Sequence, residues 1–112
     1  MNEIDKKEIN NSIKYNLSKP VMVAGKTFRE IELDFDNLTG HDFKRLSKIK
    51  EVREEAINGV IELSPTYQLN VVASASKINI NELLAFPLKD VTQLKLKALD
   101  FLLETHSEAS DL

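Results

Sequence analysis

The chain has 112 residues, of which 42% are hydrophobic and 29% charged, and its 15 basic and 18 acidic residues give a net charge of −3. This length suits one domain with a modest core, and the acidic balance argues against a general affinity for nucleic acid or anionic membranes. The chain has no cysteine and no run of about 18 apolar residues, which excludes disulfides, thiolate metal sites and a membrane span and predicts a soluble, intracellular protein.

Both ends of the chain are polar. Residues 1–12 combine charged residues and asparagines with two isoleucines, too little apolar surface to offset the entropy lost on ordering. Residues 105–112 are mostly small, polar and acidic. We therefore predict flexible segments at 1–12 and 105–112 on either side of a single domain at 13–104.

Residues 14–36 show the two-residue alternation of a β-hairpin with one apolar and one polar face. Pro20 has no N–H group, so we expect a bulge or a solvent-facing edge in the first strand. Alternate residues on a strand lie about 7 Å apart, so carboxylates at such positions form a solvated face and do not converge on a cation. The second strand carries four of them: Glu30, Glu32, Asp34 and Asp36.

The register of this hairpin follows from its apolar positions. Odd-numbered residues are apolar in both strands, so odd residues must pair with odd residues, which requires a loop with an odd number of residues. A three-residue loop at 23–25, with Gly25 in the left-handed conformation, meets this condition. The predicted cross-strand pairs are Leu17 with Ile31, Tyr15 with Leu33, and Lys14 with Asp34.

Helical segments follow to the end of the domain. Thr39 is a candidate N-cap with an aspartate three residues later, and Ser64 followed by Pro65 is a second start signal. Asn81 is expected to cap a short turn that Pro87 interrupts. The predicted helices span about residues 40–58, 65–77, 81–86 and 88–104. The predicted fold is α+β, with an N-terminal β-hairpin followed by a small bundle of three to four helices.

The last helix is more apolar than a single core contact requires. One stripe consists of Val91, Leu94, Ala98, Phe101 and Leu102. An adjoining face adds three more leucines: Leu96, Leu99 and Leu103. This width indicates one contact within the molecule and a second with a partner, and a helix central in a small bundle would show the same pattern.

The sequence offers no convincing catalytic or metal-binding group. The three glycines do not form a phosphate-binding loop, and no second ligand stands at helical spacing from His41 or His106. A basic cluster, which includes Lys44, Arg45 and Lys48, opposes the dipole of the helix that carries it. This cluster indicates a solvated face or a contact with an acidic partner.

Three segments of the chain match a recurrent order of structural motifs: LSKPVMVAGKTFREIELDF at 17–35, LTGHDFKRL at 38–46 and NELLAFPLKDVTQLKLKALDFLLE at 81–104. Together they resemble the tail assembly chaperone family of Mu-like phages. None of the matching positions is catalytic, so the resemblance rests on their order. These positions are Leu17, Pro20, Val21, Gly25, Lys26, Thr27, Thr39, Gly40, Asp42, Phe101 and Leu102.

The resemblance implies a non-enzymatic protein of a phage or prophage that binds the tape measure protein during tail assembly. It would act in the cytoplasm of the bacterial host and be absent from the mature virion. No cofactor, metal, nucleic acid, membrane or small-molecule substrate is expected. The alternatives are a structural tail or baseplate adaptor retained in the virion and a small phage-encoded regulator.

Two surfaces follow as hypotheses. The outer face of the last helix, with the basic cluster as an electrostatic guide, is expected to contact the tape measure protein. The strand edge at Pro20 is expected to allow a homo-oligomer. The residues assigned to partner binding are Leu96, Leu99, Leu103, Lys44, Arg45 and Lys48.

Overall fold

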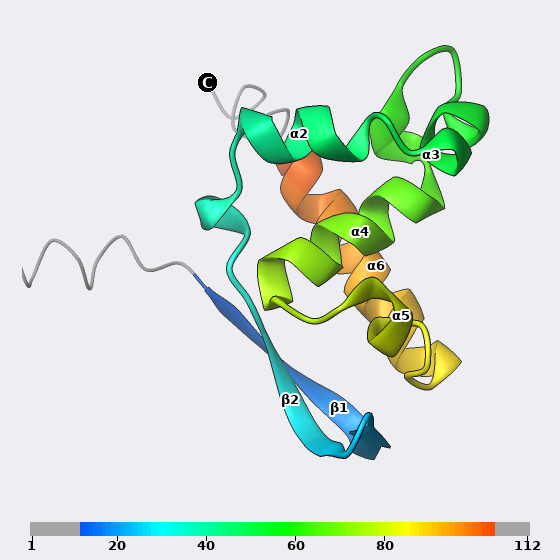
Figure 1. Cartoon of the computed structure of the whole chain (residues 1–112). Coiled ribbons are helices and arrows are strands. Elements are labelled where there is room, and N and C mark those ends of the chain that lie inside the picture. Colours follow the sequence, from blue (N-terminus) through cyan, green and yellow to red (C-terminus); the bar gives the residue numbers. More distant parts are fainter. Residues whose placement is uncertain (1–11, 105–112) are drawn as a thin grey trace, which may run out of the picture.

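The computed structural model describes residues 12–104 and places an antiparallel β-hairpin beside a group of short helices (Figure 1). The predicted α+β fold, a hairpin followed by a helical bundle, is confirmed. The segments predicted to be flexible, 1–12 and 105–112, lie outside the described residues apart from Ser12. The elements are β1 (Ile13–Val23), β2 (Lys26–Leu33), the 3-10 turn η1 (Phe35–Asn37), α2 (Gly40–Leu46), α3 (Lys50–Glu55), the 3-10 turn η2 (Ile61–Leu63), α4 (Pro65–Ser76), α5 (Ile80–Leu83) and α6 (Leu88–Leu102).

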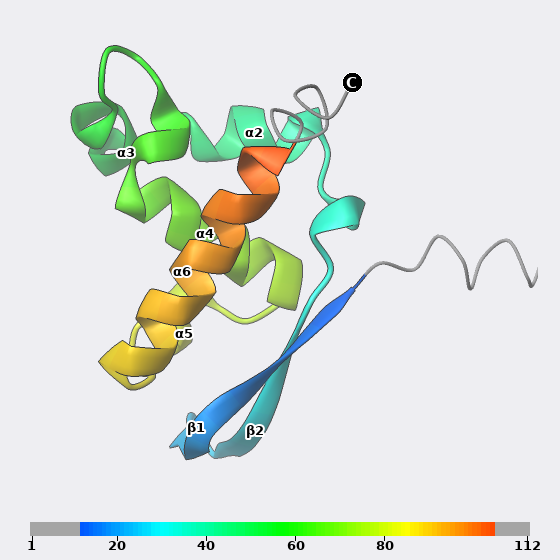
Figure 2. The ribbon, with the colours of Figure 1, turned by 180° about the vertical axis from the view of Figure 1, so that it is seen from behind.

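Helix α4 is the central element of the fold. Its most extensive helix contact is with α6, and it also touches α2, α3, α5, both 3-10 turns and β2. Helix α6 crosses α4 on the face that is turned toward the viewer in Figure 2. The side chains that are almost fully buried come from strands and helices alike: Ile31, Leu33, Val52, Val72, Leu83 and Leu94. The hairpin and the helices therefore share one core.

The hairpin turns through two residues, and the predicted three-residue loop is wrong. Ala24 and Gly25 have φ angles of 53° and 78°, the positive pair that a tight hairpin turn requires. The predicted pairs Leu17–Ile31, Tyr15–Leu33 and Lys14–Asp34 are wrong as well. The observed pairs are Ile13–Leu33, Lys14–Glu32, Tyr15–Ile31 and Asn16–Glu30 at the open end, and Val21–Phe28, Met22–Thr27 and Val23–Lys26 near the turn.

An irregularity in β1 explains the difference. The register shifts between Asn16 and Val21, so that the four residues 17–20 of β1 stand opposite the single residue Arg29 of β2. The shift by an odd number of residues lets the apolar faces coincide at the open end while the turn keeps an even number of residues. The bulge expected at Pro20 is therefore confirmed, and it is larger than the sequence suggested.

The helix predicted at 40–58 is interrupted and becomes α2 and α3. Its start is as predicted, because the Thr39 side chain accepts a hydrogen bond from the His41 N–H group and the Thr39 N–H group donates to Asp42. Two side chains bond to backbone carbonyl oxygens around the interruption: the Ser47 hydroxyl donates to Lys44, and the Arg53 guanidinium donates to Lys48. Carbonyl groups satisfied in this way no longer require a continuing helix.

Helix α3 ends at Glu55, three residues before the predicted end. A tight turn follows, in which Asn58 and Gly59 have φ angles of 53° and 79° and residues 57 and 60 form an isolated β-bridge. Asn-Gly is the strongest short signal for this turn type, and the sequence interpretation treated the glycine only as a helix stop. The turn brings Glu55 back to the start of α4, where its carboxylate accepts hydrogen bonds from Ser64 and Thr66.

The starts of α4 and α6 are as predicted, whereas the helix predicted at 81–86 is wrong at both ends and is observed at 80–83. Ser64 caps α4 by accepting a hydrogen bond from the Tyr67 N–H group, and Pro65 occupies the first helical position. Helix α5 is capped by Asn79, whose side chain accepts a bond from the N–H group of Asn81, so the predicted cap at Asn81 is wrong by two residues. Helix α6 ends at residue 102, two residues before the predicted end.

Candidate partner-binding surface

Asp90 fixes the hairpin to the first turn of α6. Its buried carboxylate accepts hydrogen bonds from the Tyr15 hydroxyl at 2.8 Å, the Ser18 N–H group at 3.0 Å and the Ser18 hydroxyl at 2.9 Å. Burial by itself would raise the pKa of Asp90, but these hydrogen bonds outweigh it and hold that pKa below its ordinary value. Burial and the contact with Asp90 raise the pKa of Tyr15 to about 12.

This contact also explains what the bulge in β1 does. Ser18 lies within the irregular stretch, and its N–H group donates to Asp90 and not to β2. Lys97, about two helical turns beyond Asp90 along α6, places its ammonium group 5.8 Å from the centre of the Tyr15 ring. The hairpin thus packs against one side of α6. The side of α6 that faces away from the core is exposed to solvent.

Four leucines occupy this outward side, and we call them the leucine stripe: Leu88, Leu96, Leu99 and Leu103. At 100° per residue, they fall within about 80° of one another around the helix axis. Leu88 is 79% exposed, Leu96 42% and Leu103 39%, whereas Leu99 is half-buried. The predicted face of the last helix therefore carries exposed leucines near both ends of α6.

The basic cluster of the sequence prediction lies near the C-terminal end of this stripe. Lys44 and Arg45 are on α2 and Lys48 is in the following turn, and all three side chains are exposed. Arg45 is partly engaged, since its guanidinium lies 2.8 Å from the carboxylate of Asp42 and 3.2 Å from the Ser74 hydroxyl. A hollow of about 130 Å³ is lined by residues of α2 and of the last turn of α6, so the two elements are neighbours.

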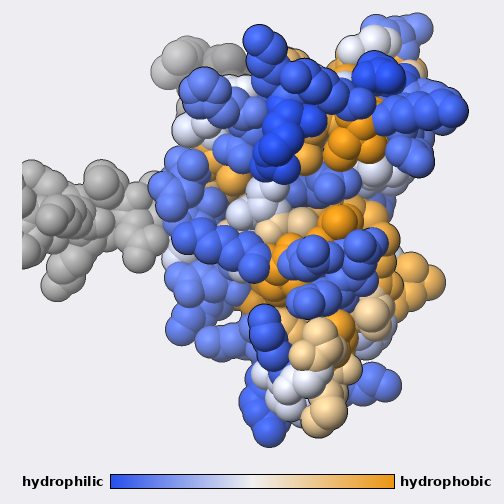
Figure 3. Space-filling view, viewed as in Figure 1, coloured by the Kyte–Doolittle hydropathy of each residue, from blue (hydrophilic) through white to orange (hydrophobic). Residues whose placement is uncertain are grey.

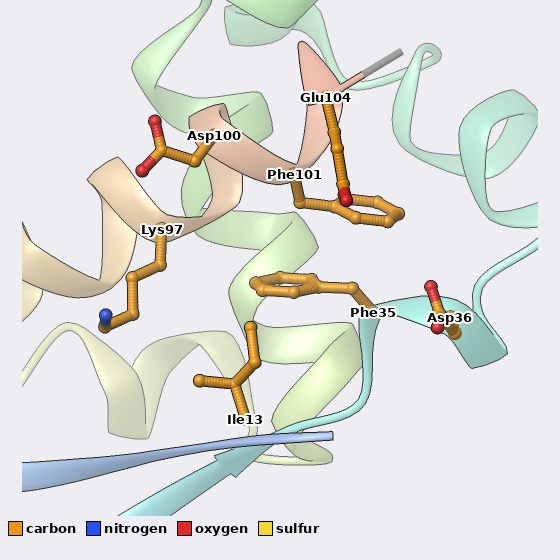
Figure 4. A pocket seen from close by; sticks show the side chains of 7 residues that line it. All are labelled: Ile13, Phe35, Asp36, Lys97, Asp100, Phe101 and Glu104. Atoms are coloured by element: carbon orange, nitrogen blue, oxygen red, sulfur yellow. The ribbon is translucent and has the colours of Figure 1, made fainter. Parts of the chain in front are cut away.

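A larger hollow, of about 600 Å³, lies between η1, the start of β1 and the end of α6 (Figure 4). Its apolar wall is the stacked pair Phe35 and Phe101, with ring centres 4.9 Å apart and planes 12° from parallel. We call it the acidic hollow, because three of its four charged lining residues are carboxylates. The lining consists of Ile13, Phe35, Asp36, Lys97, Asp100, Phe101 and Glu104.

The four carboxylates predicted on the second strand remain apart, but only Glu30 and Glu32 lie in β2, which ends at Leu33; Asp34 follows it and Asp36 lies in η1. Glu30 lies 3.7 Å from the Lys14 ammonium, Glu32 accepts a hydrogen bond from Ser12, and Asp34 accepts one from Asn37. Each of the three has its own neighbour, as expected of a solvated strand face.

The part of the chain that the structure describes contains no cluster of side chains that could bind a metal ion. His41 is an exposed residue in the first turn of α2, and His106 lies outside the described residues. Within residues 12–104, no three side chains of His, Asp or Glu are placed so that they could hold a metal ion. Among the helices described, none is long and apolar enough to cross a membrane.

Comparison with protein families decides what kind of protein carries these surfaces. The sequence model of the family described as phage tail assembly chaperone proteins, E, or 41 or 14, matches residues 14–103. The chain belongs to this family. The resemblance seen in the sequence is thereby confirmed, and family membership supports a chaperone role in phage tail assembly with a protein as partner. Comparisons with curated proteins and with solved structures found no match.

The family match covers the chaperone described above except Ser12 and two lining residues of the acidic hollow, Ile13 and Glu104. It begins at the second residue of β1 and ends one residue after α6, so that it includes the Asp90 contact and the whole leucine stripe. The family is one of chaperones, which suggests a non-enzymatic role.

Sequence reasoning missed two features of the chaperone. Leu88 was taken only as the start of the last helix, although it falls on the same helical face as Leu96 and is the most exposed leucine of α6. The contact of Asp90 with Tyr15 was not foreseen either, because the two residues are 75 positions apart and an acidic residue in a first helical turn is common.

Proposed function

We propose that this chaperone binds the tape measure protein through the leucine stripe of α6. The observation that supports the proposal is the stripe itself, in which two leucines of a 15-residue helix, Leu88 and Leu96, and its C-cap Leu103 are at least 39% exposed on one face. Contiguous apolar surface of this kind is typical of protein-binding sites. A helix of this length presents about 22 Å of surface, which suits pairing with a long helical partner.

The energetic gain would come from removing these leucines from water. Complete burial of an exposed leucine contributes roughly 1.5–3 kcal/mol, and the three exposed leucines already bury part of their surface. Together they would contribute a few kcal/mol, and the entropy of association offsets some of it. One copy would therefore bind weakly, and several copies along a long partner would cover it effectively.

Introducing negative charge on the leucine stripe tests the proposal. We expect Leu96→Glu combined with Leu103→Glu to weaken binding to the purified tape measure protein by at least about tenfold, because two carboxylates would have to be buried. Leu84→Glu is the matched control: Leu84 is 55% exposed at the end of α5, outside the stripe, and its replacement should leave binding unchanged. Unchanged binding by the double variant, with a native circular dichroism spectrum, would rule the surface out.

We further propose that the chaperone acts in the host bacterial cytoplasm and is not retained in the virion. A role in assembly requires that the bound surface be released when the tail tube replaces it. Mass spectrometry of purified virions distinguishes this role from that of a structural adaptor. Detection of the protein at a fixed copy number per virion would favour the adaptor.

A further inference from the structure

The hairpin carries opposite charges at its two ends. Residues 18–29, which form the bulge and the turn, include three basic residues and no acidic residue: Lys19, Lys26 and Arg29. All three side chains are exposed, and none makes a hydrogen bond or ion pair with a described residue. Met22 stands among them and is 75% exposed. We call residues 19–29 the hairpin tip.

The opposite end of the hairpin borders the acidic hollow. Asp100 and Glu104 make no hydrogen bond or ion pair with a described residue. In Figure 4 the carboxylate of Glu104 lies over the Phe101 ring and Asp36 lies on the Phe35 side, whereas Asp100 and Lys97 point away from the stacked rings. The hollow thus combines an aromatic wall with an acidic rim, and the single basic lining residue is already engaged with the Tyr15 ring.

The tip cannot reach the hollow of its own chain. Met22 stands nine residues along β1 from Ile13, which at about 3.3 Å per residue places it roughly 30 Å from the hollow, whereas Arg29 stands four residues, roughly 13 Å, from the end of β2. Figures 1 and 2 both show the turn of the hairpin at one end of the molecule and η1 with the end of α6 at the other. The turn of the hairpin therefore does not meet the hollow of its own chain, and a second copy can bring the two together.

We propose that the hairpin tip of one copy docks into the acidic hollow of a second copy. Met22 is an apolar, flexible side chain suited to contact with the rings of Phe35 and Phe101. Arg29, which shares its face of β2 with Thr27 opposite Met22, would approach the carboxylates on the rim, and Lys26 on the other face adds positive charge beside the turn. A hollow of about 600 Å³ has room for more than one side chain, and apolar surface over the hairpin tip and α5 is visible in Figure 3.

The interface is heterologous, because it joins two different surfaces at opposite ends of the chain. Such contacts do not stop at a dimer and produce rows or rings. They are also small, so association is weak and depends on salt. This location replaces the strand edge at Pro20, where the N–H group of Ser18 already donates to Asp90 and the ladder is irregular.

Sedimentation analysis of the purified chain alone tests this proposal independently of tape measure binding. We expect the average mass of the wild type to rise with concentration at low ionic strength, beyond that of a dimer. At about 1 M salt, where the Debye length falls to about 3 Å, the rise should disappear. A wild type that stays monomeric at every concentration at low ionic strength would overturn the proposal.

Charge reversal locates the interface. Two variants, Lys26→Glu with Arg29→Glu at the tip and Asp100→Lys with Glu104→Lys at the hollow, should each lower self-association by about tenfold or more. An equimolar mixture of the two variants should associate again, because each altered surface then meets an oppositely charged one. The control, Lys50→Glu with Lys77→Glu, changes the net charge as much as the tip variant and should associate like the wild type. Docking of the tip in the hollow would be contradicted if the control lost as much self-association as the tip variant. It would also be contradicted if the mixture of the two variants did not associate.

Discussion

Asp90 places a carboxylate in the contact between β1 and α6, where three hydrogen bonds from Tyr15 and Ser18 compensate for its burial. Among the described residues, no buried polar side-chain atom is left without a partner. Removing one member of such a network costs more than the bond itself gains, because the remaining groups lose their partner without regaining water. The stability of the hairpin contact should therefore depend strongly on this one residue.

We expect Asp90→Asn to lower the free energy of unfolding by about 2 kcal/mol at neutral pH, because the amide leaves buried donors competing for too few acceptors. Tyr15→Phe removes one hydrogen bond and leaves Ser18 in place, so a smaller loss of about 1 kcal/mol is expected. Urea denaturation measures both values. Equal stability of Asp90→Asn and wild type would show that the contact does not hold the hairpin.

The stability of the wild type and that of Asp90→Asn should depend differently on pH. The pKa of Asp90 is depressed in the folded state, so its stabilising contribution is present above the unfolded pKa of about 4 and is lost as the pH falls through the folded pKa. The stability difference between wild type and Asp90→Asn should therefore shrink below about pH 4. A difference that stayed constant down to acid unfolding would contradict this assignment.

At the level of the elements, the two positive-φ turns decide where the chain reverses. Gly59 has a φ of 79°, and a Cβ atom added there would meet no atom within 4 Å. Any cost of substitution must therefore come from the backbone conformation and not from a collision. Gly40, at the start of α2, has the same open surroundings without a positive φ.

We expect Gly59→Ala to lower the free energy of unfolding by about 1 kcal/mol, since a left-handed conformation is unfavourable for a residue with a Cβ atom. Gly40→Ala is the control and should be neutral or slightly stabilising. Thermal unfolding of the two variants compares them directly. A larger loss at Gly40 than at Gly59 would show that the turn is not under this constraint.

Local signals in the sequence were sufficient for the starts of α2 and α4, because Thr39, Ser64 and Pro65 act within a few residues of their own positions. The interruption after α2 was not predictable in the same way, since it depends on where Ser47 and Arg53 direct their side chains. The hairpin register failed for a different reason: Pro20 indicated a bulge, but neither its size nor the contact of Ser18 with Asp90 of α6 can be deduced from a local pattern.

For the candidate surface, too, one part was predictable from local sequence patterns and another part depends on how the helices pack. Helical spacing was enough to place Leu96, Leu99 and Leu103 on one face of the last helix. Whether such a face is covered depends on how the other helices pack, and only the structure shows that Leu96 and Leu103 remain exposed. The acidic hollow combines the start of β1, η1 and the end of α6, which are too far apart in the sequence for a pattern to join them.

At the level of the whole molecule, the basic cluster lies on α2 and in the turn after it, and α2 is a neighbour of the last turn of α6, so the cluster should guide an acidic partner toward the stripe. We expect Lys44→Glu combined with Lys48→Glu to slow association with the tape measure protein by about tenfold at low salt and to change dissociation little. Surface plasmon resonance at two salt concentrations separates the two rates. An unchanged association rate at low salt would show that the cluster is only a solvated face.

The length of the hairpin has a consequence for how many copies a partner can accommodate. In a row joined tip to hollow, the distance from one copy to the next would be of the order of the hairpin itself, about 30 Å. That distance corresponds to about 20 residues of a straight α-helix. The 11-residue strand would then set the spacing between neighbouring copies. The number of chaperones per tape measure protein would therefore be proportional to the length of the tape measure helix.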